Sequence, residues 1–516
     1  MTPSSNTYGG DLALSLALLA IIITVALWCK KSFLTSQPPL PPGPHGLPLV
    51  GYFPFLGPNL HLELHKLVPR YGPIFKLYMG SNLHIVVNSA ALAKVMTGEQ
   101  DESFANRSRF IAGLATSYNA SDIAFNNNSV NRRKLRKVLV HEVLSNINLE
   151  ASHAYRRRDV RKTVKDVHDA VGTAVDINEI AFSTVISVLT NIVWAKSIAK
   201  GGKFSNLVAE MRNFVTGVVE IAGGLNLSDF FPRLSMFDFQ GVERRMKNQM
   251  KLLDKIFESS VEDRMNSKSS MKEEGVNKEE GRKDFLEILL ELQQQNNESI
   301  NHHDSNESSY SRTDATSAMI EWAMTEILRN EQVMKKVQDE LTEVVGLNNI
   351  VEESHLPKLK YLDAVFKETF RLHPPLPFLL PRAPDKSCTV GGYTIPKGST
   401  IFLNVWAIQR DPQYWENPLE FNPERFFNYK GPEKWDYAGT NSKFFPLGSG
   451  RRRCPGVGLG EKMMMHVLSS LMHSFNWSLP TGQKLDLSDK FGIALKKQEP
   501  LIAIPSPRLK DASLYT

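Results

Sequence analysis

The chain has 516 residues, of which 42% are hydrophobic and 22% are charged, and its formal net charge is +6 at pH 7. These values exclude a disulfide-stapled miniprotein, a collagen-like chain and a wholly disordered chain. So small a net charge at this length does not indicate a nucleic-acid partner. The three cysteines form no Cys-x-x-Cys pair, so the sequence offers neither a disulfide framework nor a cysteine zinc site.

The N-terminal segment is the first strongly patterned element. Residues 12–28 are apolar except for Ser15 and Thr24. As a helix this run spans about 26 Å, close to the ~30 Å of a bilayer core. Lys30 and Lys31 follow directly, and the positive-inside rule places them on the cytoplasmic side. We therefore expect residues 1–31 to be a single-pass anchor with the rest of the chain cytoplasmic. The alternative, a cleaved signal peptide, lacks the basic n-region and the small-residue cleavage site that it requires.

The next segments predict a hinge and the start of a globular domain over residues 56–516. Residues 32–55 are rich in proline, which favours a stiff, extended hinge. Residues 74–78 and 84–87 predict a β-hairpin. Apolar residues recur at helical spacing through most of residues 132–253. Two basic clusters, residues 132–137 and 156–158, suit solvated helix faces, and the first also suits docking of an acidic partner.

The second half of the chain predicts more helix and short strands. Residues 259–312 are mostly polar and predict a mobile surface loop. Helix resumes at Thr313 and continues beyond Asn330. Residues 390–395 and 400–404 predict strands joined by a turn at residues 396–398. The expected fold class is therefore mainly α with small β-sheets (α+β).

Cys454 is the centre of the chemical interpretation. It lies in a loop with three arginines and several glycines, directly before a predicted helix over residues 459–474. The arginines and the helix start favour its thiolate form. A thiolate on a glycine-rich loop that admits a flat ligand suits axial ligation of haem iron, where its electron donation favours O–O cleavage. The alternative is a lone cysteine in a basic loop.

Four separate motifs place Cys454 in a wider context. Gly450, Arg452, Cys454 and Gly456 match a haem-binding signature; Glu368 to Arg371 match a Glu-x-x-Arg motif; residues 421–426 contain Pro-Glu-Arg-Phe; and an apolar anchor precedes a proline hinge. Together, and in this order, they resemble the cytochrome P-450 superfamily of haem-thiolate monooxygenases. The resemblance covers nearly the whole chain and is greatest to plant microsomal members that include terpenoid and flavonoid hydroxylases.

The resemblance implies a cofactor, partners and a location. The cofactor is haem b with Cys454 as the axial iron ligand. The partners are an NADPH-dependent reductase, O2, an apolar small-molecule substrate and membrane lipid. The location is the endoplasmic reticulum membrane, with the catalytic domain in the cytoplasm. From the amino-acid sequences of these motifs we expect a terpenoid substrate, and a flavonoid or other phenolic is the second candidate.

The resemblance also assigns roles to charged residues. It implies that Arg382 and Arg452 pair with the haem propionates, where planar guanidiniums suit carboxylates. Arg133 and Arg136 match the family's propionate-binding helix. Glu368 and Arg371 share a helix face at i,i+3 and can pair, and Arg425 completes a charge network that braces the core on the haem side.

The chain departs from the family pattern at three places. Arg132 stands where the family usually has Trp on the propionate-binding helix, and Leu447 replaces the Phe that opens the haem signature. The oxygen-activating helix is altered most, since Arg312 replaces a Gly and Ala315 stands at the position of the proton-relay Thr. Asp314 and Thr316 are the remaining candidates for proton delivery, and a segment before them is missing or altered.

These departures leave alternatives to the monooxygenase interpretation. One is a haem-binding protein that does not activate oxygen. Another is a hydroperoxide isomerase or dehydratase, which needs no proton-relay Thr.

Overall fold

The computed structural model describes residues 39–194, 203–224, 226–273, 313–492 and 494–516, together with residues 19, 22 and 23. The anchor predicted over residues 12–28 lies outside these ranges except for those three positions. In the described part of the chain, no helix combines the length and the apolar character that a membrane span requires.

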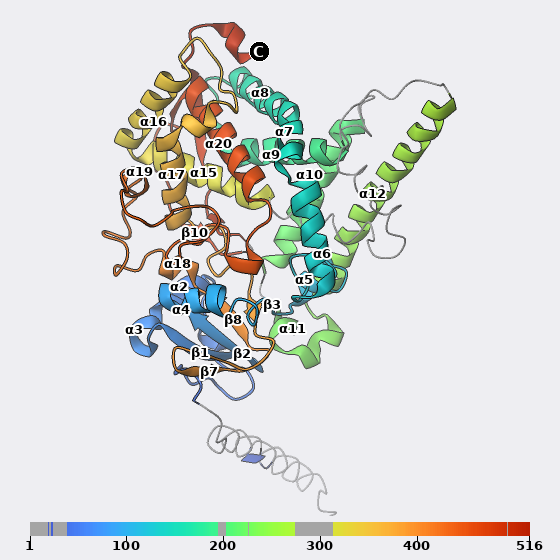
Figure 1. Cartoon of the computed structure of the whole chain (residues 1–516), viewed down its shortest axis with the longest axis vertical. Helices are drawn as coiled ribbons and strands as arrows, with labels where there is room; N and C mark the ends of the chain where they lie inside the picture. The colour runs from blue at the N-terminus through green and yellow to red at the C-terminus, as the bar shows by residue number, and fades with distance from the viewer. Residues whose placement is uncertain are drawn as a thin grey trace, which may run out of the picture.

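Helices form most of the molecule (Figure 1). The α-helices are α2 (Leu60–Lys66), α3 (Val68–Tyr71), α4 (Ala90–Lys94), α5 (Ile111–Thr116), α6 (Val130–Val138), α7 (Asn146–Ala151), α8 (His153–Asp169), α9 (Ile177–Trp194), α10 (Lys203–Ala222), α11 (Leu227–Phe230), α12 (Val242–Glu273), α15 (Thr313–Arg329), α16 (Glu331–Val344), α17 (Lys360–Leu372), α18 (Val405–Ile408), α19 (Glu424–Phe427) and α20 (Val457–Ser474). Short 3-10 or π turns are η1 (Phe53–Phe55), η2 (Val95–Glu99), η3 (Leu139–Val143), η4 (Pro232–Phe237), η5 (Leu356–Lys358), η6 (Gly450–Arg452) and η7 (Ala512–Tyr515).

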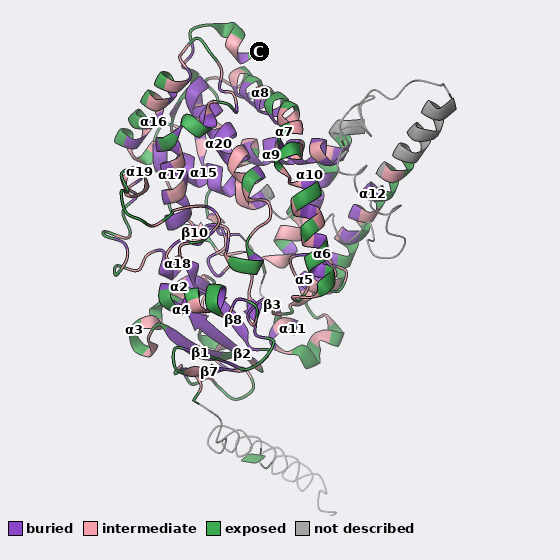
Figure 2. Cartoon of the chain, in the orientation of Figure 1, coloured by how far each residue is buried: buried purple, intermediate pink, exposed green. Residues whose placement is uncertain are grey.

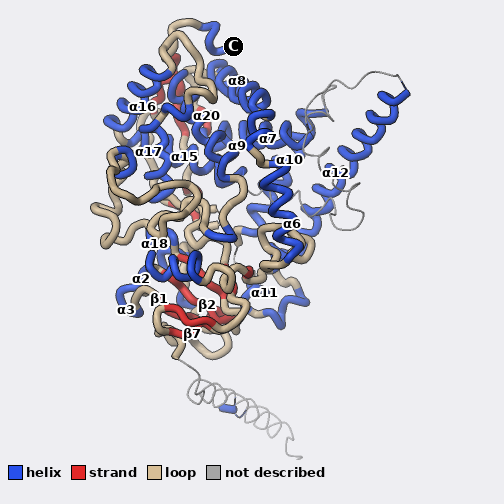
Figure 3. The backbone as a smooth tube through the Cα atoms, viewed as in Figure 1, coloured by secondary structure: helices blue, strands red, loops and turns tan. Residues whose placement is uncertain are grey.

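The strands form four small sheets. They are β1 (Ile74–Met79), β2 (Asn82–Val87), β3 (Asn106–Arg107), β4 (Val175–Asp176), β5 (Arg382–Ala383), β6 (Cys388–Val390), β7 (Tyr393–Ile395), β8 (Thr400–Leu403), β9 (Phe475–Ser478), β10 (Asp489–Lys490), β11 (Lys496–Lys497) and β12 (Ile502–Pro507). The largest sheet has the order β1-β2-β8-β5-β3, and the others are β4-β12-β9, β6-β7 and β10-β11. Figure 3 shows the five-stranded sheet at the end of the molecule away from the C-terminus. The predicted class, mainly α with small sheets, is confirmed.

Helix α15 runs through the middle of the helical core. Residues 317–327 are all buried, which fits a helix that is apolar on most of its surface. It packs against α9, α17 and α20, and Figure 2 shows these helices largely in the buried colour. Helix α17 ends at Leu372, just before Pro374 and Pro375, because proline disfavours helical backbone in the residue that precedes it.

The hairpin predicted over residues 74–87 is present as β1 and β2, with Met79 opposite Asn82. The prediction for residues 390–395 is wrong in part, because Gly391 and Gly392 take positive φ values of 58° and 81° and divide the segment into β6 and β7. Strand β8 pairs with β2 and β5 and does not pair with β7. Register between distant strands depends on the sheet and cannot be read from the local turn.

Two predictions about polar segments need correction. Helix α12 continues to Glu273, so residues 259–273 of the predicted loop are helical, and residues 274–312 lie outside the described ranges. A polar composition is compatible with a solvent-exposed helix as well as with a loop. The basic cluster at residues 156–158 is not wholly solvated either. Arg156 is fully buried and pairs with Glu353, whereas Arg157 pairs with Glu352 nearer the surface.

Candidate functional site

The loop that carries Cys454 is shaped by glycine. Gly448 and Gly450 have φ values of 79° and 63°, which L side chains rarely adopt. A Cβ atom on Gly450 would lie 2.5 Å from a carboxylate oxygen of Asp101, so only glycine fits there. The loop closes through a hydrogen bond from the Cys454 N–H to the carbonyl of Leu447 at 3.0 Å. It leaves Cys454 partly exposed, just before Gly456, which caps the N-terminus of α20.

Cys454 lines a cavity that is partly open to solvent. Gly456 lies beside it, and Ala315 and Thr316 reach the same cavity from the first turns of α15. The remaining lining is almost wholly apolar and comes mainly from α9, α15, α17 and α20. The fold thus places the sulfur of Cys454 and the altered end of α15 on one apolar cavity.

Four arginines from separate segments gather beside this loop. Arg382 on β5 and Arg452 in η6 are both buried. Arg132 on α6 is also buried, and Arg107 on β3 is partly buried. Main-chain carbonyl groups accept hydrogen bonds from all four guanidiniums, over distances that include 2.5 Å from Arg452 and 2.6 Å from Arg107.

Carboxylates balance only part of this charge. Among the described residues, those that act on the four guanidiniums are Asp101 and Asp122. Asp101 accepts a hydrogen bond from Arg382 at 2.9 Å. Burial, followed by repulsion from the other three guanidiniums, lowers the pKa of Arg452 to about 7. Burial is also the main cause that lowers the pKa of Arg107 to about 9. The cluster therefore holds more positive charge than the two carboxylates can balance.

The two arginines expected on the propionate-binding helix, Arg133 and Arg136, are less buried than Arg382 and Arg452. Arg133 is exposed, and its guanidinium donates to the carbonyl of Asn128 at 3.4 Å. Arg136 is partly buried and close enough to Arg132 to lower its pKa. The residue of α6 that enters the cluster is Arg132. The sequence analysis placed it on a solvated helix face and noted it as a departure from the family, but it is buried. The available signal was its spacing from Leu135 and Leu139, which are buried on the same helix face.

These features fit haem. In the described part of the chain, no three His, Cys, Asp or Glu side chains gather to hold a metal ion. Cys454 would supply a thiolate ligand to the haem iron, as the haem-binding signature implies. The apolar cavity suits the faces of a porphyrin. The surplus positive charge of the arginine cluster suits the carboxylates of the haem propionates in sign.

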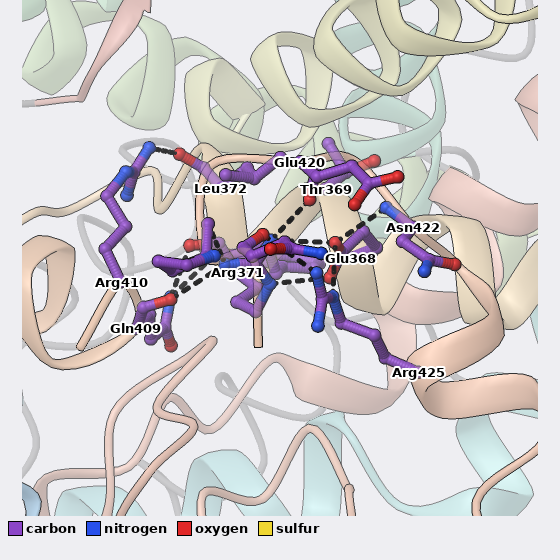
Figure 4. Close-up of polar contacts among 12 residues, drawn as sticks. Glu368, Thr369, Arg371, Leu372, Gln409, Arg410, Glu420, Asn422 and Arg425 are labelled. Atoms are coloured by element: carbon purple, nitrogen blue, oxygen red, sulfur yellow. Dashed lines mark hydrogen bonds and ion pairs between the residues drawn. The ribbon is translucent and has the colours of Figure 1, made fainter. Parts of the chain in front are cut away.

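Glu368, Arg371 and Arg425 form a buried network, drawn in Figure 4. Arg371 donates to both carboxylate oxygens of Glu368, at 2.6 and 2.7 Å, and both side chains are fully buried. Arg425 approaches the same carboxylate at 3.3 Å. Arg371 also donates to the main-chain carbonyls of residues 409, 418 and 420. The network thus ties α17 to the long segment between α18 and α19.

The two candidates for proton delivery lie at the start of α15. Asp314 is buried and forms an ion pair with Lys496 of β11. Its second carboxylate oxygen is buried and has no hydrogen-bond partner within the described structure. Thr316 lines the cavity together with Ala315, although it is rotated by about 100° on the helix. The structure therefore brings the Thr316 residue, but not Asp314, to the wall of the cavity that contains Cys454.

Comparison with known proteins agrees with the haem site inferred from this geometry. The family model described as Cytochrome P-450 matches residues 41–504. The chain belongs to the cytochrome P-450 family of haem-thiolate monooxygenases.

The chain is similar to individual members of this family. Geraniol 8-hydroxylase of Catharanthus roseus is 36% identical over 499 residues, which cover 95% of this chain and 98% of that protein. Flavonoid 3',5'-hydroxylase of Solanum melongena is 34% identical over 480 residues, which cover 91% of each chain. A solved zebra fish cytochrome P-450, in a structure with abiraterone, is 25% identical with a TM-score of 0.71, and the match covers 87% of this chain and 99% of that one. The predicted resemblance to plant terpenoid and flavonoid hydroxylases is confirmed.

Proposed function

We propose that this chain is a membrane-anchored monooxygenase that hydroxylates an apolar small molecule, with a terpenoid as the favoured substrate. The observation that carries the proposal is the position of Cys454 on an apolar cavity, opposite the start of α15 and beside a cluster of surplus positive charge. The relatives include hydroxylases of geraniol, a terpenoid, and of flavonoids. A flavonoid or other phenolic is therefore the second choice of substrate.

The cofactor of the proposal is haem b, held by residues of three kinds. Cys454 would supply the thiolate ligand to the iron, and Gly456 lies beside it on the cavity. Arg382 and Arg452 would hold the propionates, and their burial would strengthen these charge-assisted hydrogen bonds. When bound in this way, haem supplies the activation of O2 that inserts one oxygen atom into a C–H bond.

Side chains on α15 deliver the protons that this reaction consumes. Thr316 lines the cavity, and its hydroxyl would pass a proton onward from water. Asp314, two residues earlier, supplies a carboxylate whose charge Lys496 balances. A threonine among the residues of the cavity wall favours the monooxygenase over the two alternatives, an oxygen-inactive haem protein and a hydroperoxide isomerase or dehydratase, even though Ala315 replaces the usual Thr.

The buried network around Glu368 stabilises the cavity wall through helix α17. Helix α17 contributes both Glu368 and Arg371 to the network and Phe370 to the cavity wall. We expect the network, completed by Arg425, to hold that wall in place and not to take part in the chemistry.

The electrons come from an NADPH-dependent reductase that docks near Cys454. Arg451 and Arg453, which flank Arg452, are exposed, and α6 adds Arg133, Lys134 and Lys137. Arg132 donates to the carbonyl of Arg451 at 2.7 Å, which brings these two groups of positive charge together. Such a surface steers an acidic partner. The anchor over residues 12–28 would hold the chain on the endoplasmic reticulum, with lipid as a further partner and the domain in the cytoplasm.

The first test is the carbon-monoxide difference spectrum of the dithionite-reduced protein in microsomes. We expect the red-shifted Soret band that thiolate ligation gives. Cys454→Ser should lose this band, whereas Cys388→Ser, in the separate β6-β7 hairpin, should retain it. Loss of the band in both variants, or in neither, would contradict the assignment of Cys454.

Turnover then separates the three functions. With reductase and NADPH, we expect hydroxylation of a terpenoid alcohol faster than hydroxylation of a flavanone. Conversion of a hydroperoxide without reductase, and no NADPH-dependent product, would favour the isomerase or dehydratase. A normal spectrum with neither activity would favour the oxygen-inactive protein.

A further inference from the structure

Helix α20, which begins just after Cys454, contacts different parts of the molecule with two of its faces. Leu459 and Met463 line the cavity that Cys454 also lines. Lys462 and His466 lie on another face, because residues four apart on a helix share a face. That second face meets the segment between α16 and α17.

A buried carboxylate joins the second face of α20 to α8. Arg156 of α8 is fully buried, and its guanidinium donates to one oxygen of Glu353 at 2.8 Å and to the hydroxyl of Ser152 at 2.6 Å. The Nζ atom of Lys462 lies 3.6 Å from the same oxygen of Glu353, and the Nδ1 atom of His466 lies 3.9 Å from the other. Glu353 therefore bridges α8 and α20.

The carboxylate of this bridge is ionised at pH 7. Burial alone would raise the pKa of Glu353, but the hydrogen bonds and the charge of Arg156 outweigh burial and hold the pKa below its usual value. Burial lowers the pKa of His466 to about 4, so its imidazole is neutral. Lys462 therefore contributes the positive charge of α20 to the bridge, and it also lies 3.2 Å from the carboxylate of Glu150.

The segment that carries Glu353 contacts α20 a second time. The Nε2 atom of His473, seven residues after His466, donates to the carbonyl of Asn349 at 3.0 Å. Residues 349–353 thus make polar contacts at two levels of the helix. Apolar packing is not directional, whereas these contacts depend on distance and direction. They restrict movement of α20 along its own axis.

We propose that Glu353 is a positioning residue of the haem site, which fixes α20 along its axis and so holds the thiolate of Cys454 at the iron. This inference rests on the proposed binding of haem through Cys454. Gly456 caps α20 two residues after Cys454, so a shift of the helix moves the loop that carries the sulfur. The start of α20 also favours the thiolate form only while it stays close to that sulfur.

A role in stability alone gives a different expectation. Loss of Glu353 would leave the charge of Arg156 buried and unbalanced, which destabilises the fold as a whole. Any change at Cys454 would then follow the free energy of unfolding. A positioning role predicts a change in thiolate ligation that remains after stability has been restored.

The test is the rate at which the purified, full-length, reduced protein with carbon monoxide loses its red-shifted Soret band, with urea unfolding measured on the same preparations. Glu353→Gln removes the charge and keeps the size of the side chain. Glu352→Gln is the matched control, since its pair with Arg157 lies nearer the surface. We expect Glu353→Gln to lose the band at least about fivefold faster than the wild type. The control should stay within about twofold of the wild type.

The double variant Arg156→Met/Glu353→Leu separates position from stability. Apolar side chains in place of a buried ion pair often restore stability, but this variant leaves Lys462 and His466 without the carboxylate. We expect its free energy of unfolding to return to the wild-type value, while its band is still lost at least about fivefold faster. Recovery of both quantities would overturn the proposal, as would loss of the band from Glu353→Gln at the wild-type rate.

A smaller change decides if either variant yields no holoprotein or if the double variant stays unstable. Glu353→Asp keeps the charge but withdraws the carboxylate, and Glu352→Asp is its control. Faster loss of the band from Glu353→Asp than from the control would support the proposal, and equal rates would refute it. The wild-type spectrum separates the two proposals. Absence of the red-shifted band refutes haem-thiolate binding itself, whereas a normal band with indifferent Glu353 variants refutes only the role of Glu353.

Discussion

Replacement of Glu368 by Gln should destabilise the protein severely. The carboxylate accepts two hydrogen bonds from Arg371, at 2.6 and 2.7 Å, and one from the main-chain N–H of Asn422 at 2.8 Å. Gln keeps one acceptor oxygen but leaves the charge of Arg371 buried and unbalanced. Removal of one partner from a buried pair costs about 3–5 kcal/mol. Typical unfolding free energies are about 5–15 kcal/mol, so the loss is a large share of the total.

The assay is urea unfolding followed by tryptophan fluorescence, with haem content measured on the same samples. A double-mutant cycle with Arg371→Met isolates the pair, and we expect a coupling energy of at least about 2 kcal/mol. Lys162→Met is the control, since it breaks an exposed pair with Asp166 that is worth less than about 0.5 kcal/mol. An unfolding free energy of Glu368→Gln within about 1 kcal/mol of the wild type would refute the reasoning.

Three further predictions concern other parts of the structure. Thr316→Val removes the hydroxyl of a residue that lines the cavity and should lower product formed per NADPH about tenfold or more, with peroxide as the diverted product; unchanged coupling would exclude Thr316 from proton delivery. Burial lowers the pKa of His84 to about 4. The unfolded chain therefore binds the proton more readily, and stability should fall by about 3 kcal/mol as the pH drops from about 6.5 to 4. His84→Phe should flatten that part of the curve in urea titrations, and an equally steep curve would assign the dependence elsewhere. Gly450→Ala should cost about 2–4 kcal/mol, because its Cβ meets Asp101 at a positive φ, and wild-type thermal stability would contradict this.

The sequence located the parts of the site that depend on local motifs. Cys454 precedes its helix, and Glu368 and Arg371 pair at i,i+3, because spacing along one segment decides such positions. The resemblance supplied Arg382 and Arg452, which come from distant segments. Both are buried in the arginine cluster.

The errors concern the direction in which a basic side chain points. The sequence analysis placed residues 156–158 on a solvated helix face, but Arg156 is buried against Glu353. Helical spacing groups residues by face but does not say which face turns inward when arginines occupy several faces. For Arg156, the deciding partner lies 197 residues away in the sequence. Only the tertiary fold supplies such a counter-charge.

The proline-rich segment has a consequence for handling the protein. Strand β1 is the edge of the five-stranded sheet, and an exposed edge invites pairing with other chains. Residues 42–52 cover that edge: the carbonyl of Pro42 accepts from the N–H of Lys76 at 2.8 Å, and Tyr52 donates to the carbonyl of Tyr78 at 2.6 Å. A chain shortened for crystallisation should therefore begin before Pro39, whose carbonyl accepts from Thr394 at 3.1 Å. A truncation that removes residues up to 52 would expose the unpaired edge of β1 and favour aggregation during purification.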